Sequence, residues 1–223
     1  MKGCYRQLGK NNKNVVLITK DNINDYCHIP QSIFDKVNRG DITFTHLSDI
    51  LRVSLLAEHG GLWLDSTCWV PAALPQYVTD ATLISPRTKN LPDLPSWSNS
   101  RWCGWGTGTN VKGNPLFVFA RDLMYDFYKT NSRIPFYLFI DYIYDYAYRH
   151  DAHIKQMIDD IPENSTTRNA LHFLLNTAWI EDKYNELCQG KNWVFKLSYK
   201  SVWKDTTVDG KPTFYNVLIK QNK

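Results

Sequence analysis

The stretch "THLSDILRVSLLAEHGGLWLDSTCWV", residues 45–70, joins an apolar helix pattern to a short strand pattern through two glycines. Apolar residues occupy most faces of residues 45–59, which predicts a buried helix. Gly60 supplies the left-handed stop that helix C-termini favour, and residues 62–64 are predicted to form a buried strand. Because a helix that leads into a parallel strand is half of a β-α-β unit, the stretch predicts an α/β fold.

Similar patterns extend this prediction over the whole chain. Further helices are predicted at residues 30–40, 115–128, 135–149, 167–176 and 179–188, and further strands at 14–19, 81–85, 193–199 and 213–220. Asn114 supplies the cap of the clearest of these helices, and Pro115 its first turn. We therefore expect one α/β domain with a mainly parallel central sheet flanked by helices and a helical second half.

The composition excludes several classes of protein. With 223 residues, 43% of them hydrophobic, the chain can bury a sizeable core and is not disordered. Its net charge of +4 comes from interspersed residues, which argues against a nucleic-acid binder. Five scattered cysteines without a C-x-x-C pair predict neither a disulfide framework nor a zinc ribbon. The sequence shows no secretion signal and no transmembrane run, so we expect a cytoplasmic protein.

Aromatic residues make up 14% of the chain, including eight tryptophans and thirteen tyrosines. Clefts rich in aromatic side chains suit sugar rings and nucleobases. A core and surface rich in tyrosine explain the same composition equally well.

Asp65 follows the predicted strand at residues 62–64 directly, and Thr67 comes two positions later. In open α/β sheets, ligands bind just outside the carboxyl ends of the strands. A carboxylate and a hydroxyl could hold Mg²⁺ or Mn²⁺ together with the phosphates of a substrate. Alternatively, Asp65 caps the turn that follows it, and the residues alone leave both interpretations open.

Asp49 and Arg52 lie three positions apart on the apolar helix and therefore share a face. A charge that is buried without a partner costs several kcal/mol, so these two side chains should pair or line a cleft. The alternative is a surface ion pair that contributes about 0.2–0.5 kcal/mol.

The combined pattern is S-D-x-x-R, an apolar helix, G-G, a short strand and an acid, with Asp49 and Asp65 sixteen positions apart. This pattern resembles the core signature of the capsular polysaccharide synthesis glycosyltransferases, which are related to the sugar-binding transferases that carry a D-x-D motif. The resemblance covers most of the chain, since "VVLITKDN" and "IPQSIFDKVNRGDI" precede the core, and "KGNPLFVFARDLMYDFYKTN" and "IPFYLFIDYIYDYAYRH" follow it.

The resemblance implies a GT-A type nucleotide-sugar-binding fold. It places donor binding in about residues 1–110, an acceptor-side helical part in about 111–190, and C-terminal strands or a flap in 191–223. It also implies an activity, which is retaining transfer of a sugar from a nucleotide diphosphate donor, a UDP-sugar, to a surface or capsular polysaccharide. A lipid-linked glycan acceptor would bring the protein to the inner face of the membrane.

The resemblance also implies roles for individual residues. The expected catalytic residues are Asp49, Arg52 and Asp65; the first two would bind hydroxyl groups of the donor sugar, and Asp65 with Thr67 would hold Mn²⁺ or Mg²⁺. The implied donor-binding residues are Ser48, Asp49, Arg52, Gly61, Asp65, Ser66 and Thr67.

The chain departs from the family's pattern in two ways. Where the wider group has D-x-D, this chain has D-S-T, so Thr67 replaces the second acid and metal binding should be weaker. Family members usually begin with an additional aromatic-rich strand, whereas this chain begins at about the helix that follows it. These departures give grounds for a rival hypothesis beside the leading one of a glycosyltransferase, namely a catalytically inactive carbohydrate- or nucleotide-binding protein with the same fold.

Three further positions are candidates for the acceptor side or a flap. In the glycine-rich segment 103–110, Trp105 could stack on a sugar, although a structural turn explains the glycines as well. Asp141 could face the acceptor, or could belong with Asp145 to a solvated polar stripe on one helix. Trp203 could lie in a C-terminal flap over the diphosphate, as in related transferases.

Overall fold

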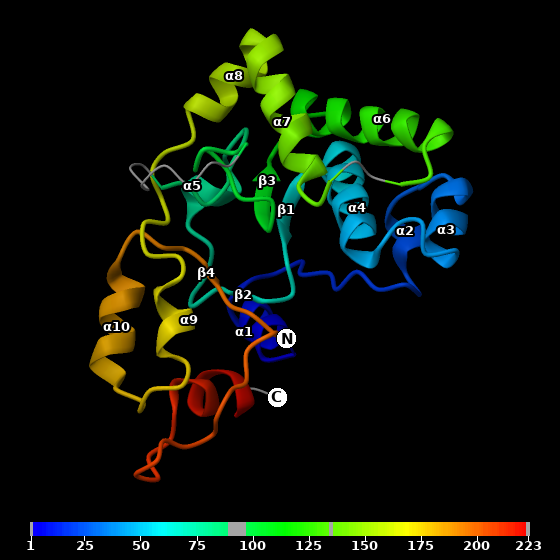
Figure 1. Cartoon of the computed structure of the whole chain (residues 1–223). Coiled ribbons are helices and arrows are strands. Elements are labelled where there is room, and N and C mark those ends of the chain that lie inside the picture. The colour runs from blue at the N-terminus through cyan, green and yellow to red at the C-terminus, as the bar shows by residue number, and fades with distance from the viewer. Residues whose placement is uncertain (1, 89–96, 134–135, 222–223) are drawn as a thin grey trace.

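The computed structural model describes residues 2–88, 97–133 and 136–221, and within them the chain is mostly helical (Figure 1). The helices are α1 (Lys2–Asn11), α2 (Ile23–Tyr26), α3 (Gln31–Asn38), α4 (Phe44–His59), α5 (Gln76–Thr79), α6 (Pro115–Thr130), α7 (Phe139–His150), α8 (Ala152–Asp159), α9 (Ala170–Leu174), α10 (Glu181–Gln189) and a π-helical turn, η1 (Tyr215–Lys220). The strands are β1 (Gly61–Leu64), β2 (Cys68–Trp69), β3 (Gly106–Thr109) and β4 (Phe195–Lys196).

The described strands form two small antiparallel sheets. In one sheet β1 pairs with β3, and in the other β2 pairs with β4, so that Cys68 lies opposite Lys196. The predicted α/β fold of GT-A type, with a mainly parallel central sheet flanked by helices, is therefore wrong. The strand that follows α4 does form, but its partner β3 runs in the opposite direction.

The other predicted strands show why the parallel sheet does not form. Residues 14–19 form no strand, and Val16 and Leu17 are each 48% exposed. Residues 81–85 contribute only an isolated bridge, between Ile84 and Gly108. Residues 213–220 mostly form η1. Short apolar runs are compatible with strands, buried helices and exposed segments alike, and only long-range packing selects among them.

The helix predictions rest on local signals and agree better with the structure. α4 and α6 confirm the helices predicted at 45–59 and 115–128. α4 ends at Gly60 with a φ of 70°, and the side chain of Asn114 accepts a hydrogen bond from the Leu116 N–H at the start of α6.

The remaining predicted elements are present with shorter bounds. α3, α9 and α10 lie within or close to the predicted helices at 30–40, 167–176 and 179–188, while β4 occupies only part of the predicted strand at 193–199. α7 begins at Phe139 rather than at residue 135, which lies outside the described residues.

The glycine-rich segment 103–110 supplies β3. A Cβ atom on Gly108 would lie 2.6 Å from the backbone oxygen of Gly61, so the close pairing of β1 with β3 requires glycine there. Gly108 therefore has a structural role in this sheet, while the turn that the alternative interpretation predicted is confined to Gly104 and Trp105.

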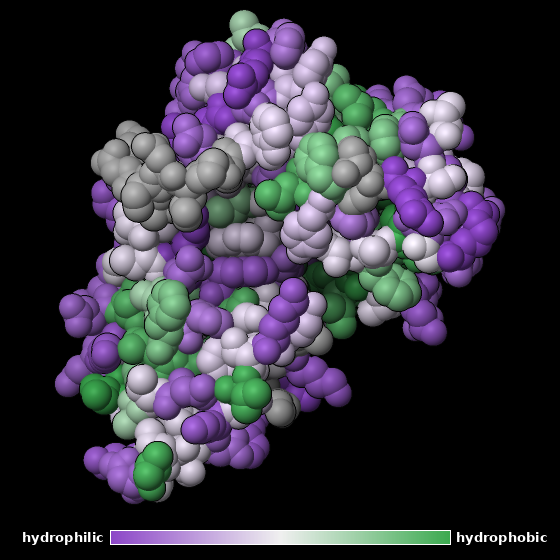
Figure 2. All heavy atoms as spheres, viewed as in Figure 1, coloured by the Kyte–Doolittle hydropathy of each residue, from purple (hydrophilic) through white to green (hydrophobic). Residues whose placement is uncertain are grey.

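The buried side chains form two clusters. One includes α4, α6 and α7, and the other gathers Trp69, Phe195 and Phe214 with residues of α1, α9 and η1. Figure 1 shows the first cluster's helices in the upper part of the view and α1, α9, α10 and η1 in the lower part. Figure 2 shows that the face in view is hollowed between these two parts, with hydrophilic atoms in the hollow. Figure 1 places β1, β3 and β4 in this region.

Candidate functional site

Asp65 begins the tight turn that connects β1 with β2. Its backbone N–H donates to the Trp105 carbonyl (2.9 Å), and its carbonyl accepts from the Cys68 N–H (2.9 Å). The carboxylate instead accepts hydrogen bonds from Trp63 Nε1 (3.1 Å), Arg52 Nη2 (3.3 Å) and Lys196 Nζ (2.8 Å). The turn is therefore closed by the backbone, and the carboxylate of Asp65 is turned toward cations rather than toward the turn.

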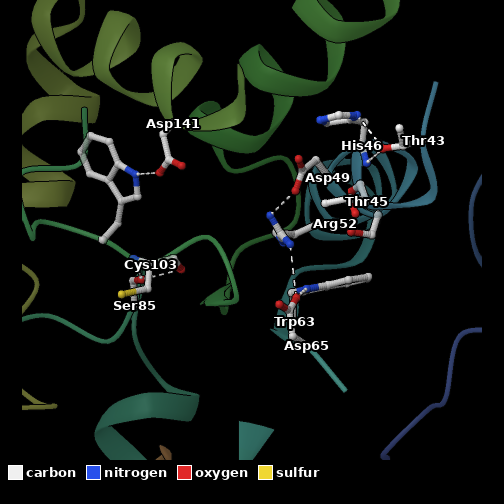
Figure 3. Close-up of polar contacts among 12 residues, drawn as sticks. Thr43, Thr45, His46, Asp49, Arg52, Trp63, Asp65, Ser85, Cys103 and Asp141 are labelled. Carbon is white, nitrogen blue, oxygen red and sulfur yellow. Dashed lines mark hydrogen bonds and ion pairs between the residues drawn. The ribbon is translucent and has the colours of Figure 1, made fainter. Parts of the chain in front are cut away.

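Arg52 joins the two acids that the sequence singled out (Figure 3). Its Nη1 donates to Asp49 (2.8 Å), its Nη2 to Asp65 (3.3 Å), and its guanidinium carbon lies 5.4 Å from the centre of the Trp63 ring. The Arg52 side chain is 5% exposed. The ion pair of Asp49 with Arg52 is thus buried, and the alternative of a surface pair is wrong. We call Asp49, Arg52, Asp65 and Lys196 the Asp65 cluster.

Asp49 has an altered acidity within this cluster. Burial, opposed by the Arg52 guanidinium and reinforced by the charges of Asp141 and Asp65, raises the pKa of Asp49 to about 6. At neutral pH Asp49 is ionised but close to protonation. Perturbed acids of this kind concentrate at functional sites, although structural ion pairs also produce them.

Lys196 belongs to this cluster but was not among the site residues predicted from the sequence. It reaches Asp65 because β2 pairs with β4 in a register that sets Cys68 opposite Lys196. Its Nζ lies 2.8 Å from Asp65 Oδ2 and 5.4 Å from the centre of the Trp105 ring. A single cation within the apolar segment "WVFKLSY" was the available signal, but the sequence does not show which acid it pairs with.

The loop that precedes β3 lies against the cluster. Trp105 contributes its carbonyl to Asp65 N–H and its ring to Lys196. A Cβ atom on Gly104 would lie 3.2 Å from Arg52 Nη1, so the backbone of this loop approaches the guanidinium closely. Trp105 is therefore a neighbour of the site.

Asp141 and Asp145 have separate environments. Asp141 accepts a hydrogen bond from the indole of Trp102 (2.7 Å), and burial raises the pKa of Asp141. Asp145 is buried between Arg101 (2.6 Å) and Arg149 (2.7 Å). The interpretation of these two acids as a solvated stripe is wrong. We call Asp145, Arg101 and Arg149 the Asp145 cluster.

The other predicted donor-binding residues surround α4 and the turn. Ser48 donates to the Thr45 carbonyl within α4 (2.7 Å), and Gly61 opens β1 with a φ of 87°. Ser66 and Thr67 occupy the turn after Asp65, and the Thr67 carbonyl accepts from the Leu197 N–H (3.0 Å).

Trp203 lies apart from these residues. Its indole donates to the Ser198 carbonyl (2.9 Å), and its ring lies 5.2 Å from that of His172. It packs against the second buried cluster, and no described contact connects it to Asp65.

The side chains present can be compared with the ligands that a divalent cation requires. Within residues 2–88, 97–133 and 136–221, no group of three or more His, Cys, Asp or Glu side chains gathers as a metal site. Asp65 offers one carboxylate, with Thr67 two positions on. Magnesium is commonly held by one or two carboxylates together with substrate phosphates. Both oxygens of this carboxylate are already paired, Oδ1 with Arg52 and Oδ2 with Lys196, so a divalent cation would need a phosphate ligand and would displace one of these partners.

A hollow of about 540 Å³ lies elsewhere, bordered by residues 71–77, 162–164 and 188–193. Its asparagines are already engaged, Asn164 with Arg87 and Ser85 and Asn192 with Thr167. The Asp65 cluster, with its convergent charges, is the stronger candidate for chemistry.

The chain matches the family of capsular polysaccharide synthesis proteins over residues 1–218. No curated protein and no solved structure matches it. No helix of the described residues is long and apolar enough to cross a membrane. Since the match spans nearly all of the 223 residues, the chain belongs to the capsular polysaccharide synthesis protein family.

Proposed function

We propose that this protein is a glycosyltransferase that moves a sugar from a nucleotide diphosphate donor, a UDP-sugar, onto a surface or capsular polysaccharide. The observation that carries the proposal is the buried Arg52, which Asp49 and Asp65 hold from two sides. Membership of the capsular polysaccharide synthesis family supports the same activity. The acceptor is a glycan or a lipid-linked glycan, and a lipid-linked acceptor would place the enzyme at the inner face of the membrane.

Asp49 and Arg52 are suited to bind the sugar of the donor. A carboxylate accepts hydrogen bonds from hydroxyl groups, and a guanidinium next to it donates them, so the pair can hold neighbouring hydroxyls of one ring. Arg52 is held rigidly by its two ion pairs and by the Trp63 ring, which favours a fixed sugar orientation. Ser48 precedes Asp49 on the same helix and is included among the proposed donor contacts.

The opposite end of the cluster is suited to the diphosphate. Lys196 and Arg52 bring two cations to Asp65, and cations stabilise the charge that develops on a diphosphate leaving group. Asp65 and Thr67 would hold Mn²⁺ or Mg²⁺ together with the donor's phosphates, and the ion would supply Lewis-acid stabilisation of the leaving group. Gly61 and Ser66 flank Asp65 in β1 and in the turn, and complete the proposed donor contacts. We infer retention of the anomeric configuration from the family resemblance.

Calorimetric titration of nucleotide sugars with and without Mn²⁺ tests the proposal, using the wild type and Asp65→Asn. One donor should bind in a metal-dependent manner, and its turnover should fall at least about 100-fold in the variant, because the ion that Asp65 would hold supplies the stabilisation of transition-state charge. The melting temperature should change little, because the Asp65 side chain is 32% exposed and such ion pairs contribute about 0–1 kcal/mol.

Asp126→Asn is the matched control, because Asp126 is an exposed acid of α6 paired only with Lys129 among the described contacts. It should retain full turnover. Full turnover in Asp65→Asn, or no binding of any nucleotide sugar to the wild type, would overturn the proposal. Binding without turnover in the wild type would favour the rival function, a carbohydrate- or nucleotide-binding protein.

A further inference from the structure

A third carboxylate faces the Asp65 cluster from a different helix. Asp141 projects from α7, and the indole N–H of Trp102 holds its Oδ1 at 2.7 Å. Trp102 is itself buried, and Arg101 lies over its ring at 4.7 Å. The orientation of Asp141 is therefore set by a fixed neighbour, while Oδ2 has no hydrogen-bond partner among the described residues.

Asp141 interacts electrostatically with both Asp49 and Arg52. Burial raises the pKa of Asp141 against the opposing charge of Arg52, and the charge of Asp141 adds to the burial that raises the pKa of Asp49. No described hydrogen bond joins Asp141 to either residue. Figure 3 shows the Asp141 carboxylate and the Asp49–Arg52 pair as separate groups, with no contact drawn between them. α4, which carries Asp49 and Arg52, and α7, which carries Asp141, both pack against α6, and this packing fixes their relative positions.

Two buried polar atoms near Asp49 and Asp141 lack hydrogen-bond partners among the described residues. They are Nε of Arg52 and the hydroxyl of Tyr144, which lies on α7 three positions after Asp141. The phenol of Tyr144 is close enough for the charges of Arg52, Asp141 and Asp49 to act on its pKa. Unsatisfied buried groups are uncommon in folded proteins and call for an explanation such as a binding or catalytic role.

We propose that Asp141 is a sugar-binding residue, which accepts a hydrogen bond from a hydroxyl of the donor sugar on the side opposite Asp49. This role rests on the proposed function, and it adds a residue of α7 to the donor-sugar site that α4 and β1 provide. Hydroxyl groups surround a pyranose ring, so one sugar can donate to acids on two helices while Arg52 donates to its oxygens.

The charges of the site also define the class of sugar. Asp49, Asp65 and Asp141 together outnumber the two cations, Arg52 and Lys196, that lie among them. A neutral hexose or N-acetylhexosamine adds hydroxyl donors without charge. A uronic acid would bring a further carboxylate toward Asp49 and Asp141, which like-charge repulsion disfavours.

The experiment compares UDP with UDP-glucose, UDP-galactose, UDP-N-acetylglucosamine and UDP-glucuronate, each titrated with Mn²⁺ into the wild type and Asp141→Asn. Asparagine keeps the oxygen that accepts from Trp102, so the variant should fold with an unchanged melting temperature. Its affinity for UDP should stay within twofold of the wild type. Its affinity for the neutral UDP-sugar that binds best should fall about tenfold to 100-fold, which corresponds to the loss of one hydrogen bond to a charged group.

Asp126→Asn again serves as control and should bind every ligand as the wild type does. UDP-glucuronate should bind the wild type at least about tenfold more weakly than the neutral UDP-sugar that binds best. This difference in affinity should become smaller in Asp141→Asn. An unchanged affinity of Asp141→Asn for the UDP-sugar, or a wild type that prefers UDP-glucuronate, overturns the role of Asp141 while the proposed function stands. A wild type that binds neither UDP nor any UDP-sugar overturns both.

Discussion

The Asp145 cluster and the Asp65 cluster are both built from buried charges, but they differ in how completely those charges are matched. Asp145 has a 4% exposed side chain, and each of its oxygens meets an arginine, Arg101 at 2.6 Å and Arg149 at 2.7 Å. The Arg101 guanidinium also lies between the rings of Trp102 and Tyr148, at 4.7 and 3.9 Å. Asp145 and Arg101 are therefore fully engaged within the protein, while Arg149, with a 65% exposed side chain, closes the cluster from the surface.

The Asp65 cluster is open by comparison. Asp65 is 32% exposed, Arg52 leaves a buried Nε without a partner among the described residues, and the pKa of Asp49 is raised. Closed ion-pair networks hold a fold together, whereas an open network leaves charges for a ligand. The comparison therefore indicates a structural role for Asp145 and supports the binding role proposed for the Asp65 cluster.

Asp145→Ala should produce the largest loss of stability. Removing this acid leaves Arg101 buried without its partner, and breaking a buried pair costs about 3–5 kcal/mol. Urea unfolding followed by tryptophan fluorescence measures the change. Asp126→Ala, which removes an exposed acid, should change stability by no more than about 0.5 kcal/mol. A similar small loss in both variants would contradict the structural role of the Asp145 cluster.

The stability of the wild type relative to Asp49→Asn should depend on pH. Burial raises the pKa of Asp49 from its ordinary value of 3.8 to about 6, so the folded state binds this proton more tightly than the unfolded state. The stabilisation from that proton is present below about pH 4 and is lost as the pH rises to about 6. The loss amounts to at most about 3 kcal/mol, at about 1.4 kcal/mol per pH unit.

Urea unfolding of both proteins at pH 4.5 and pH 7.5 measures this difference. Other titrating groups contribute similarly to both proteins and cancel in the comparison. The wild type should therefore lose stability relative to Asp49→Asn between the two pH values. A difference that stays constant with pH would mean that Asp49 is not held in a site that disfavours its charge.

Lys196→Met should have only a small effect on the stability of the fold. The Lys196 side chain is 25% exposed, and its ion pair with Asp65 should contribute no more than about 1 kcal/mol to stability. If Lys196 binds the donor diphosphate, its loss should weaken UDP binding about tenfold, equivalent to about 1.4 kcal/mol. Calorimetry with UDP and a thermal melt separate the two effects. A large loss of stability with unchanged UDP affinity would place Lys196 among the structural charges instead.

The sequence alone determined the features that depend on neighbouring residues. The apolar period of α4, its stop at Gly60, and the Asn114 cap of α6 are all present as expected, because these signals act within a few residues of the backbone. The spacing of Asp49 and Arg52 placed them on one helical face, and the same motif indicated the family.

Only the tertiary structure decided the features that join distant segments. The direction of β3 against β1, the pairing of Lys196 with Asp65 across 131 positions, and the placement of Asp141 opposite Asp49 follow from packing between elements. A strand's own residues do not state which partner it will meet or in which direction, because both are set by burial and hydrogen bonding in the assembled fold. The prediction of a parallel sheet was wrong for this reason, while a local motif was enough to single out the two acids and the arginine that the structure brings together.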